Sequence, residues 1–194
     1  MMRRGRKRRD SPSVIPREIL EAVDNKGRVI ALLPRGEIHR QRLRHRAVHV
    51  FIFSPKGEIY LQKRAAHKDE HPGLWDSSAA GHVSPGEPNI VAARRELQEE
   101  LNILCNLIEV GTIEACEETG WEFVSFYVGV TNKTPVPDPV EIETGRFFST
   151  EEVEKLLAQS PEIFTPAFRL LWEIFKEKGL PLLKAKEFEA KDLE

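Results

Sequence analysis

Residues 81–103 read GHVSPGEPNIVAARRELQEELNI, and this stretch carries three acidic side chains at helical spacing. Glu96, Glu99 and Glu100 would share one face of a helix, because residues three and four apart meet on the same side. Carboxylates packed so closely repel one another, and a divalent cation relieves that repulsion. Oxygen-rich clusters suit Mg²⁺ or Mn²⁺, which also bind substrate phosphates. The stretch therefore predicts a metal-binding helix over about 89–101.

A short loop precedes this helix. Two glycines and a proline between residues 81 and 87 require the chain to turn sharply there. Arg95 adjoins the acidic cluster, and Glu87 is a plausible partner for its guanidinium group. Asn89 is a candidate N-cap for the helix. The alternative is an ordinary amphipathic surface helix rich in Glu and Arg, which are both good helix formers.

The stretch resembles the Nudix box, G-x5-E-x7-R-E-U-x-E-E-x-G-U, in which U is an aliphatic residue. The matching positions are Gly81, Glu87, Arg95, Glu96, Leu97, Glu99, Glu100 and Ile103. The single departure is Asn102, where the family has glycine. That position follows the helix and needs a left-handed backbone, which Asn tolerates best among the other residues.

The resemblance implies hydrolysis of a diphosphate bond, by water, in a nucleoside diphosphate derivative or a similar small molecule. The implied ligands of Mg²⁺ (or Mn²⁺) are the carboxylates of Glu96, Glu99 and Glu100 and the carbonyl oxygen of Gly81. Such a cation bridges phosphate oxygens and lowers the pKa of bound water. Arg95 and Glu87 would orient the acidic helix from outside the ligand shell.

The general base stays open at this point. Some family members use a glutamate of the box, for which Glu96 or Glu99 is the candidate. Others use an acid from a later loop, which here would be Glu141 or Glu143 in DPVEIETG. The base must come within hydrogen-bond reach of the attacking water. The alternative is that both later glutamates are exposed loop acids.

Residues 45–83 are similar to the isopentenyl-diphosphate isomerase-like branch of the Nudix superfamily. An Arg and a Lys that contact the substrate diphosphate in that branch correspond to Arg64 and Lys68. Such a pair can neutralise phosphates that the metal leaves free, whereas the alternative is a solvated basic loop. Trp75 also matches the branch, and would either stack on a base or belong to the core. Trp121 and Phe123 could border the pocket.

The isomerase-like branch also has a histidine-rich metal site. Its ligands would correspond to His39, His45, His82 and Glu122, while a further carboxylate position falls on Gly120, which cannot serve. We therefore expect a vestigial metal site, or else histidines that are hydrogen-bonded structural residues.

Two departures separate the chain from the isomerases. Ala80 stands where they have their catalytic cysteine, so no thiol is available for proton transfer to carbon. The isomerases also keep fewer glutamates of the box, whereas this chain keeps all of them. The sequence thus favours a magnesium-dependent hydrolase over an isomerase or a non-catalytic nucleotide-binding module.

The composition is typical of a soluble globular protein. The 194 residues are 40% hydrophobic and 31% charged, with a net charge of −2. No run is long enough to span a bilayer, and the two cysteines imply no disulfide framework. These features predict a cytoplasmic protein without a membrane partner, whose net charge gives no general attraction to nucleic acid.

Apolar periodicity predicts an α+β domain, which the resemblance refines to a Nudix α/β/α sandwich around a mixed sheet. An N-terminal hairpin is expected at 19–24 and 29–33, and its edge could serve a homodimer. A polar link would cover 35–46. Further strands are expected at 47–53, 58–64, 107–115, 122–130 and 146–148, and further helices at 150–159 and 166–178. The predicted parts are a basic disordered tail at 1–13, a Nudix domain at 14–180 and a charged C-terminal tail at 181–194.

Overall fold

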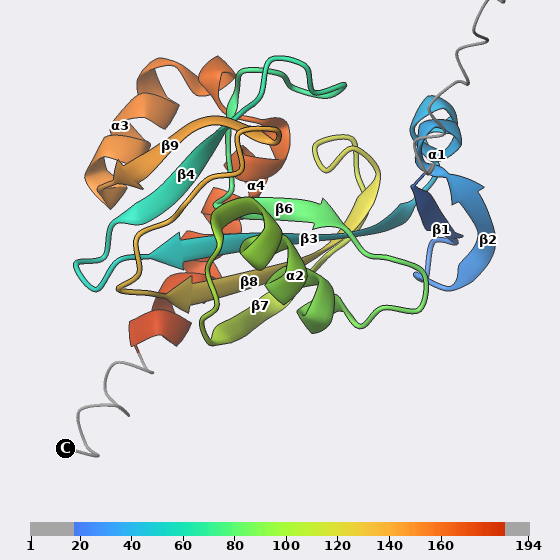
Figure 1. Ribbon diagram of the computed structural model, residues 1–194, viewed down its shortest axis with the longest axis horizontal. Helices are drawn as coiled ribbons and strands as arrows, with labels where there is room; N and C mark the ends of the chain where they lie inside the picture. The colour runs from blue at the N-terminus through green and yellow to red at the C-terminus, as the bar shows by residue number, and fades with distance from the viewer. Residues whose placement is uncertain (1–17, 185–194) are drawn as a thin grey trace, which may run out of the picture.

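Strand β3 (His45–Phe53) is the centre of the sheet in the computed structural model, which describes residues 18–184. It runs parallel to β8 (Glu122–Val130) and antiparallel to β6 (Ala79–His82). Its sequence is almost continuously apolar because helices cover both faces of the sheet (Figure 1). The expected mixed sheet between helical layers is therefore confirmed.

The other strands extend the sheet from β3. They are β1 (Ile19–Val23), β2 (Val29–Pro34), β4 (Ile59–Arg64), β5 (Trp75–Asp76), β7 (Leu107–Ile113) and β9 (Ile142–Phe148). The β1–β2 hairpin attaches to one end of β3, as predicted. Strand β4 meets β3 at only two residue pairs and lies mainly along β9, which is longer than the predicted 146–148 strand.

Alternate side chains of β3 supply two separate cores. Val50 packs in the cluster beneath α2 (Asn89–Leu101). Phe51 packs in the opposite cluster, which α4 (Pro166–Ile174) covers with Trp172. This alternation follows from the two-residue period of a strand. It anchors α2 rigidly against the sheet, with its charged face left for the site.

Several local predictions are confirmed. Helix α2 has the predicted bounds, and Asn102 adopts the left-handed conformation with φ of 54°. Helix α3 (Thr150–Gln159) begins after Ser149, whose hydroxyl accepts a hydrogen bond from the Glu152 N–H at 3.1 Å. A short 3₁₀ turn, η1 (Pro161–Ile163), connects α3 to α4.

The predicted polar link contains a helix, α1 (Arg35–Gln41). Ile38 is fully buried there against Leu20 and Ala22 of the hairpin. A single apolar residue in a seven-residue helix produces no visible periodicity, so the sequence pattern missed it.

Asn89 is not the N-cap of α2, which is Pro88 without a side-chain cap bond. The Asn89 amide instead donates to the Ser125 hydroxyl at 2.7 Å and accepts from Arg46 at 3.0 Å. The Asn89 side chain, which the local sequence suggested as the helix cap, is thus engaged in tertiary hydrogen bonds instead.

The last helix does not end at residue 178, where the sequence predicts its end. The chain continues through a π-helical turn, η2 (Phe175–Gly179), and stays helical to residue 184, with Leu183 buried in the core. A Cβ at Gly179 would lie 2.6 Å from the Phe175 ring, so close packing explains the glycine. The predicted 1–13 tail lies outside the described residues, as do residues 185–194 of the predicted C-terminal tail.

Candidate active site

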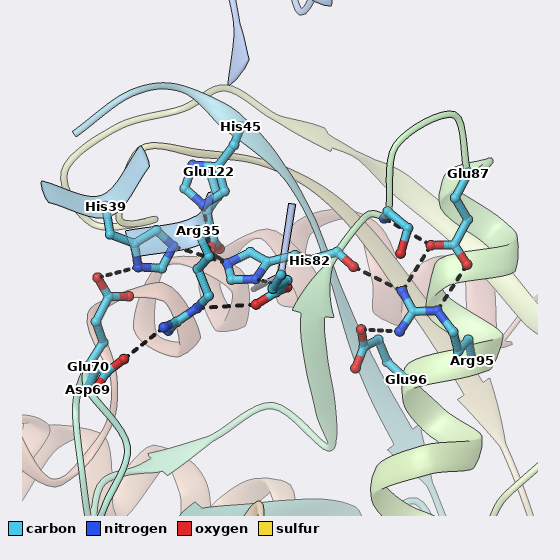
Figure 2. A network of polar contacts seen from close by, with 12 residues as sticks. Arg35, His39, His45, Asp69, Glu70, His82, Glu87, Arg95, Glu96 and Glu122 are labelled. Carbon is cyan, nitrogen blue, oxygen red and sulfur yellow. Dashed lines mark hydrogen bonds and ion pairs between the residues drawn. The ribbon is translucent and has the colours of Figure 1, made fainter. Parts of the chain in front are cut away.

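A cavity of about 740 Å³ opens between α1, β6, α2 and the 65–73 loop. Its wall is polar, and it includes most of the residues that the sequence nominated. Those residues are Arg64, Lys68, Gly81, His39, His82, Arg95, Glu96, Glu99, Glu100, Glu122 and Glu141. One end of the cavity is formed by the carboxylates of α2, the other by histidines (Figure 2).

At the helix end, the three box glutamates face the cavity together, as predicted. Glu100 is 6% exposed, and its Oε2 accepts hydrogen bonds from Gln62 Nε2 at 2.9 Å and from the Ala80 N–H at 3.1 Å. Burial raises the pKa of Glu100 to about 8, and the nearby charge of Glu96 adds to the rise. Burial likewise raises the pKa of Glu96. Desolvated neighbouring carboxylates of this kind fit a divalent cation, whose charge would lower both values.

Gly81 allows β6 to approach this helix. A Cβ at this position would lie 2.2 Å from Glu96 Cδ, far inside contact distance. The glycine therefore leaves room for the Glu96 carboxylate directly against the β6 backbone. This close approach fits the expected pairing of a backbone oxygen with the helix carboxylates around one cation.

Arg95 connects the acidic helix to the loop before it (Figure 2). Its Nε and Nη2 donate to the two oxygens of Glu87 at 3.0 and 2.9 Å, which confirms the predicted pair. Nη1 donates to Glu96 at 2.6 Å and to Glu99 at 3.2 Å, and Nη2 also donates to the His82 carbonyl at 3.0 Å. One guanidinium thus fixes both the loop and the carboxylates, because its planar fork holds several acceptors at once.

The basic side of the cavity comes from β4 and the loop after it. Arg64 Nη1 donates to Asp76 at 3.2 Å, and Lys68 pairs with Glu141. Burial lowers the pKa of Lys68, and the nearby charge of Arg64 lowers it further. Glu143 does not line the cavity; its carboxylate lies 2.9 Å from the Lys63 ammonium group instead. Of the two later glutamates, only Glu141 is therefore brought to the site.

At the histidine end, ring nitrogens of His39, His45 and His82 lie within 4.8 Å of one another. Glu122 Oε1 is 3.5 Å from His45 Nε2 and 3.4 Å from His82 Nε2. The buried His45 Nε2 has no hydrogen-bond partner among the described residues. Three imidazoles and a carboxylate around an unsatisfied nitrogen fit a transition-metal cation.

The outer nitrogens of these histidines are engaged by other groups. His39 Nδ1 lies 3.3 Å from Glu70, His82 Nδ1 lies 2.9 Å from Glu18, and His45 Nδ1 lies 2.9 Å from the Leu43 carbonyl. Partners of this kind fix the ring orientation of metal-binding histidines. These contacts are compatible with both expectations, a set of metal ligands and hydrogen-bonded structural histidines.

At the histidine end, the pKa values of His82 and Glu122 depend on each other's charge. Burial alone would lower the pKa of His82, but Glu122 and Glu18 raise it to about 9. Burial alone would raise the pKa of Glu122, but its contacts with His45, His49 and His82 hold it well below the usual range. The cluster therefore holds a protonated imidazole against a carboxylate near neutral pH.

Several residues of the cavity were not identified from the sequence. His49 extends the histidine end, with Nδ1 2.7 Å from the Ser77 hydroxyl and Nε2 3.9 Å from Glu122. Glu18 and Glu70 support the histidines, and Asp76 supports Arg64. Only the alternating pattern of β3, which places 45, 47 and 49 on one face, could have suggested His49.

The aromatic candidates lie away from the cavity. Trp75 packs against Phe148 at a centroid distance of 4.9 Å, which confirms its reading as a core residue. Trp121 lies under the Arg44 guanidinium at 5.8 Å, and Phe123 lines a separate cavity of about 400 Å³. Neither Cys105 nor Cys116 lines the main cavity, where Ala80 occupies the wall.

The fold and the site define a class of protein: a mixed sheet between helical layers that presents a carboxylate-bearing helix to a polar cavity. The model of the NUDIX domain matches residues 43–168, and the chain belongs to the Nudix family. Proteins of this family generally use divalent metals. No helix within residues 18–184 has the length and apolar character needed to cross a membrane.

Curated relatives of the chain include isomerases and a hydrolase. The chain is 37% identical to an isopentenyl-diphosphate Delta-isomerase of Nocardia farcinica (strain IFM 10152), over 80% of this chain and 93% of that protein. It is 51% identical to Nudix hydrolase 3 of Arabidopsis thaliana over 36% of this chain and 9% of that protein. In fold it resembles the DR0079 protein of Deinococcus radiodurans, with a TM-score of 0.70 and 24% identity over 83% of this chain and 99% of that one.

Proposed function

We propose that the protein is a divalent-cation-dependent hydrolase of a small-molecule diphosphate. The observation that carries the proposal is that Glu96, Glu99 and Glu100 of the box face one cavity, with Ala80 where an isomerase needs its thiol. A cation held by Glu96, Glu99, Glu100 and the Gly81 carbonyl would neutralise phosphate charge and acidify bound water. Arg64 and Lys68 line the same cavity, where they can bind the remaining phosphate oxygens.

In the proposed step, the oxygen of a water molecule forms a bond to one phosphorus atom. The bridging P–O bond breaks, and its electron pair stays on the departing phosphate. The proton of the water passes to a carboxylate. Glu96 is our candidate for this base, because its carboxylate lines the cavity at the proposed cation, whereas Glu141 is already paired with Lys68.

A second candidate function is isomerisation of isopentenyl diphosphate. Two findings favour it. Relatives that align over nearly their whole length are named isopentenyl-diphosphate Delta-isomerases, and this chain has the cluster of His39, His45, His82 and Glu122. Against it stand Ala80 and Gly120, which cannot supply the thiol and the carboxylate that the resemblance to isomerases would require.

The test is release of phosphate from a panel of nucleotides and other diphosphates with Mg²⁺, by wild type, Glu99→Gln and the control Glu162→Gln. Glu162 is exposed on η1, outside the cavity. We expect Glu99→Gln to lower kcat by about a thousandfold or more, because a metal ligand is lost, and the control to keep it. Equal rates in all three proteins would refute the catalytic proposal. Conversion of isopentenyl to dimethylallyl diphosphate would establish the second candidate instead.

A further inference from the structure

We infer that the group attached to the diphosphate is polar, such as a sugar or another polyol, rather than an isoprenyl chain. The inference rests on the proposed hydrolysis, since it concerns the substrate of the same cavity. It is carried by the chemistry of the cavity wall, which is a separate observation from the box glutamates.

The cavity is large enough to enclose a whole small ligand. Its volume of about 740 Å³ lies in the range of sites that bury most of the ligand surface. A diphosphate occupies only part of that space. The remaining group of the substrate is therefore in contact with the wall, and the wall chemistry selects it.

That wall is predominantly polar. Among the described residues, the lining includes no Leu, Ile, Val, Met, Phe, Tyr or Trp side chain, and Ala80 and Ala167 are its largest aliphatic groups. An isoprenyl chain gains affinity only where apolar surface leaves water on binding. An isoprenyl chain therefore lacks a complementary surface in this cavity.

Hydroxyl groups, by contrast, find several partners. Beyond the residues already tied in ion pairs, the wall offers the carboxylates of Asp138 and Glu118 and the ring nitrogens of His67 and His71. Asp138 has no Lys, Arg or His partner within residues 18–184, and its Oδ1 accepts from the Val140 N–H at 2.9 Å. Its second oxygen is left for a ligand. Because the Asp138 N–H donates to the Glu100 carbonyl at 2.8 Å, this acid lies beside the catalytic helix.

The first experiment compares kcat/KM of the wild-type protein with Mg²⁺ for 5-phosphoribosyl 1-diphosphate and isopentenyl diphosphate. We expect the sugar diphosphate to be preferred by about tenfold or more, because sites that hydrogen-bond hydroxyls reject compounds lacking them. Preference for isopentenyl diphosphate would overturn the inference and leave the hydrolase proposal intact. Failure to hydrolyse any diphosphate, inorganic pyrophosphate included, would overturn both.

The second experiment uses Asp138→Asn, which retains the oxygen that accepts from Val140. We expect KM for 5-phosphoribosyl 1-diphosphate to rise about tenfold while KM for inorganic pyrophosphate stays constant, because only the sugar hydroxyls contact this position. Glu162→Gln is again the control and should change neither value. An equal rise for both substrates would indicate a structural effect, and unchanged values would show that Asp138 does not contact the sugar; either result contradicts this role.

Discussion

The helix end and the histidine end of the cavity are assembled in different ways. Glu96, Glu99 and Glu100 come from little more than one turn of α2, whereas His39, His45, His82 and Glu122 come from four separate elements. The helix end offers carboxylate oxygens as metal ligands, whereas the histidine end offers imidazole nitrogens. The comparison teaches that a local set is fixed by helix geometry, while a non-local set depends on the packing of the whole sheet.

The largest expected effect tests the helix end. We expect Glu96→Gln to lower kcat by about a thousandfold, since the proposed base is removed. The free energy of unfolding should not fall, because burial already disfavours the charged form of Glu96 and Gln is neutral. Phosphate release and urea unfolding measure the two quantities, with Glu162→Gln as control. A fall in stability together with activity would make Glu96 a structural residue.

An intermediate effect is the pH dependence of stability, to which the two ends of the cavity contribute over different pH ranges. In the metal-free protein, His82 has a pKa of about 9 against about 6.5 for an unfolded histidine, so it stabilises the fold below pH 6.5 and loses that contribution as pH rises through 9. Glu100, raised to about 8, also binds its proton more tightly in the folded state, and its contribution is lost between about pH 4.5 and 8. We therefore expect stability to fall with rising pH, by about 3 kcal/mol from the His82 contribution.

Unfolding by urea in the presence of EDTA, at several pH values, measures this dependence. Glu100→Gln should flatten the curve below pH 8, and His82→Gln should flatten it between 6.5 and 9. A wild-type curve that stays level or rises over this range would contradict both assignments.

The smallest expected effect concerns the carboxylates that contact the outer ring nitrogens of the histidines. We expect Glu18→Gln to weaken binding of Mn²⁺ at the histidine cluster about tenfold, because the contact that orients His82 is weakened. Calorimetric titration measures the affinity. Glu37→Gln, on α1 but paired with Arg40, is the matched control and should bind as wild type does. Unchanged binding in Glu18→Gln would show that this carboxylate does not support a metal site.

Sequence reasoning did best where one segment contains all the information. The bounds of α2, the left-handed Asn102 and the Glu87–Arg95 pair all follow from spacing within the box. It failed where a tertiary contact decided the outcome. The short helix α1 depends on burial of Ile38, and Gly179 is explained by its contact with Phe175.

The sequence by itself determined the family and the acidic face of α2, because a helix of 3.6 residues per turn fixes which side chains meet. The tertiary structure alone decided that Glu141 reaches the cavity and Glu143 does not, that His49, Glu18 and Glu70 join the histidines, and that the tryptophans stay outside. The physical reason is that such contacts depend on strand register and loop packing, which join residues distant in the chain and are encoded by the whole core rather than by any one segment.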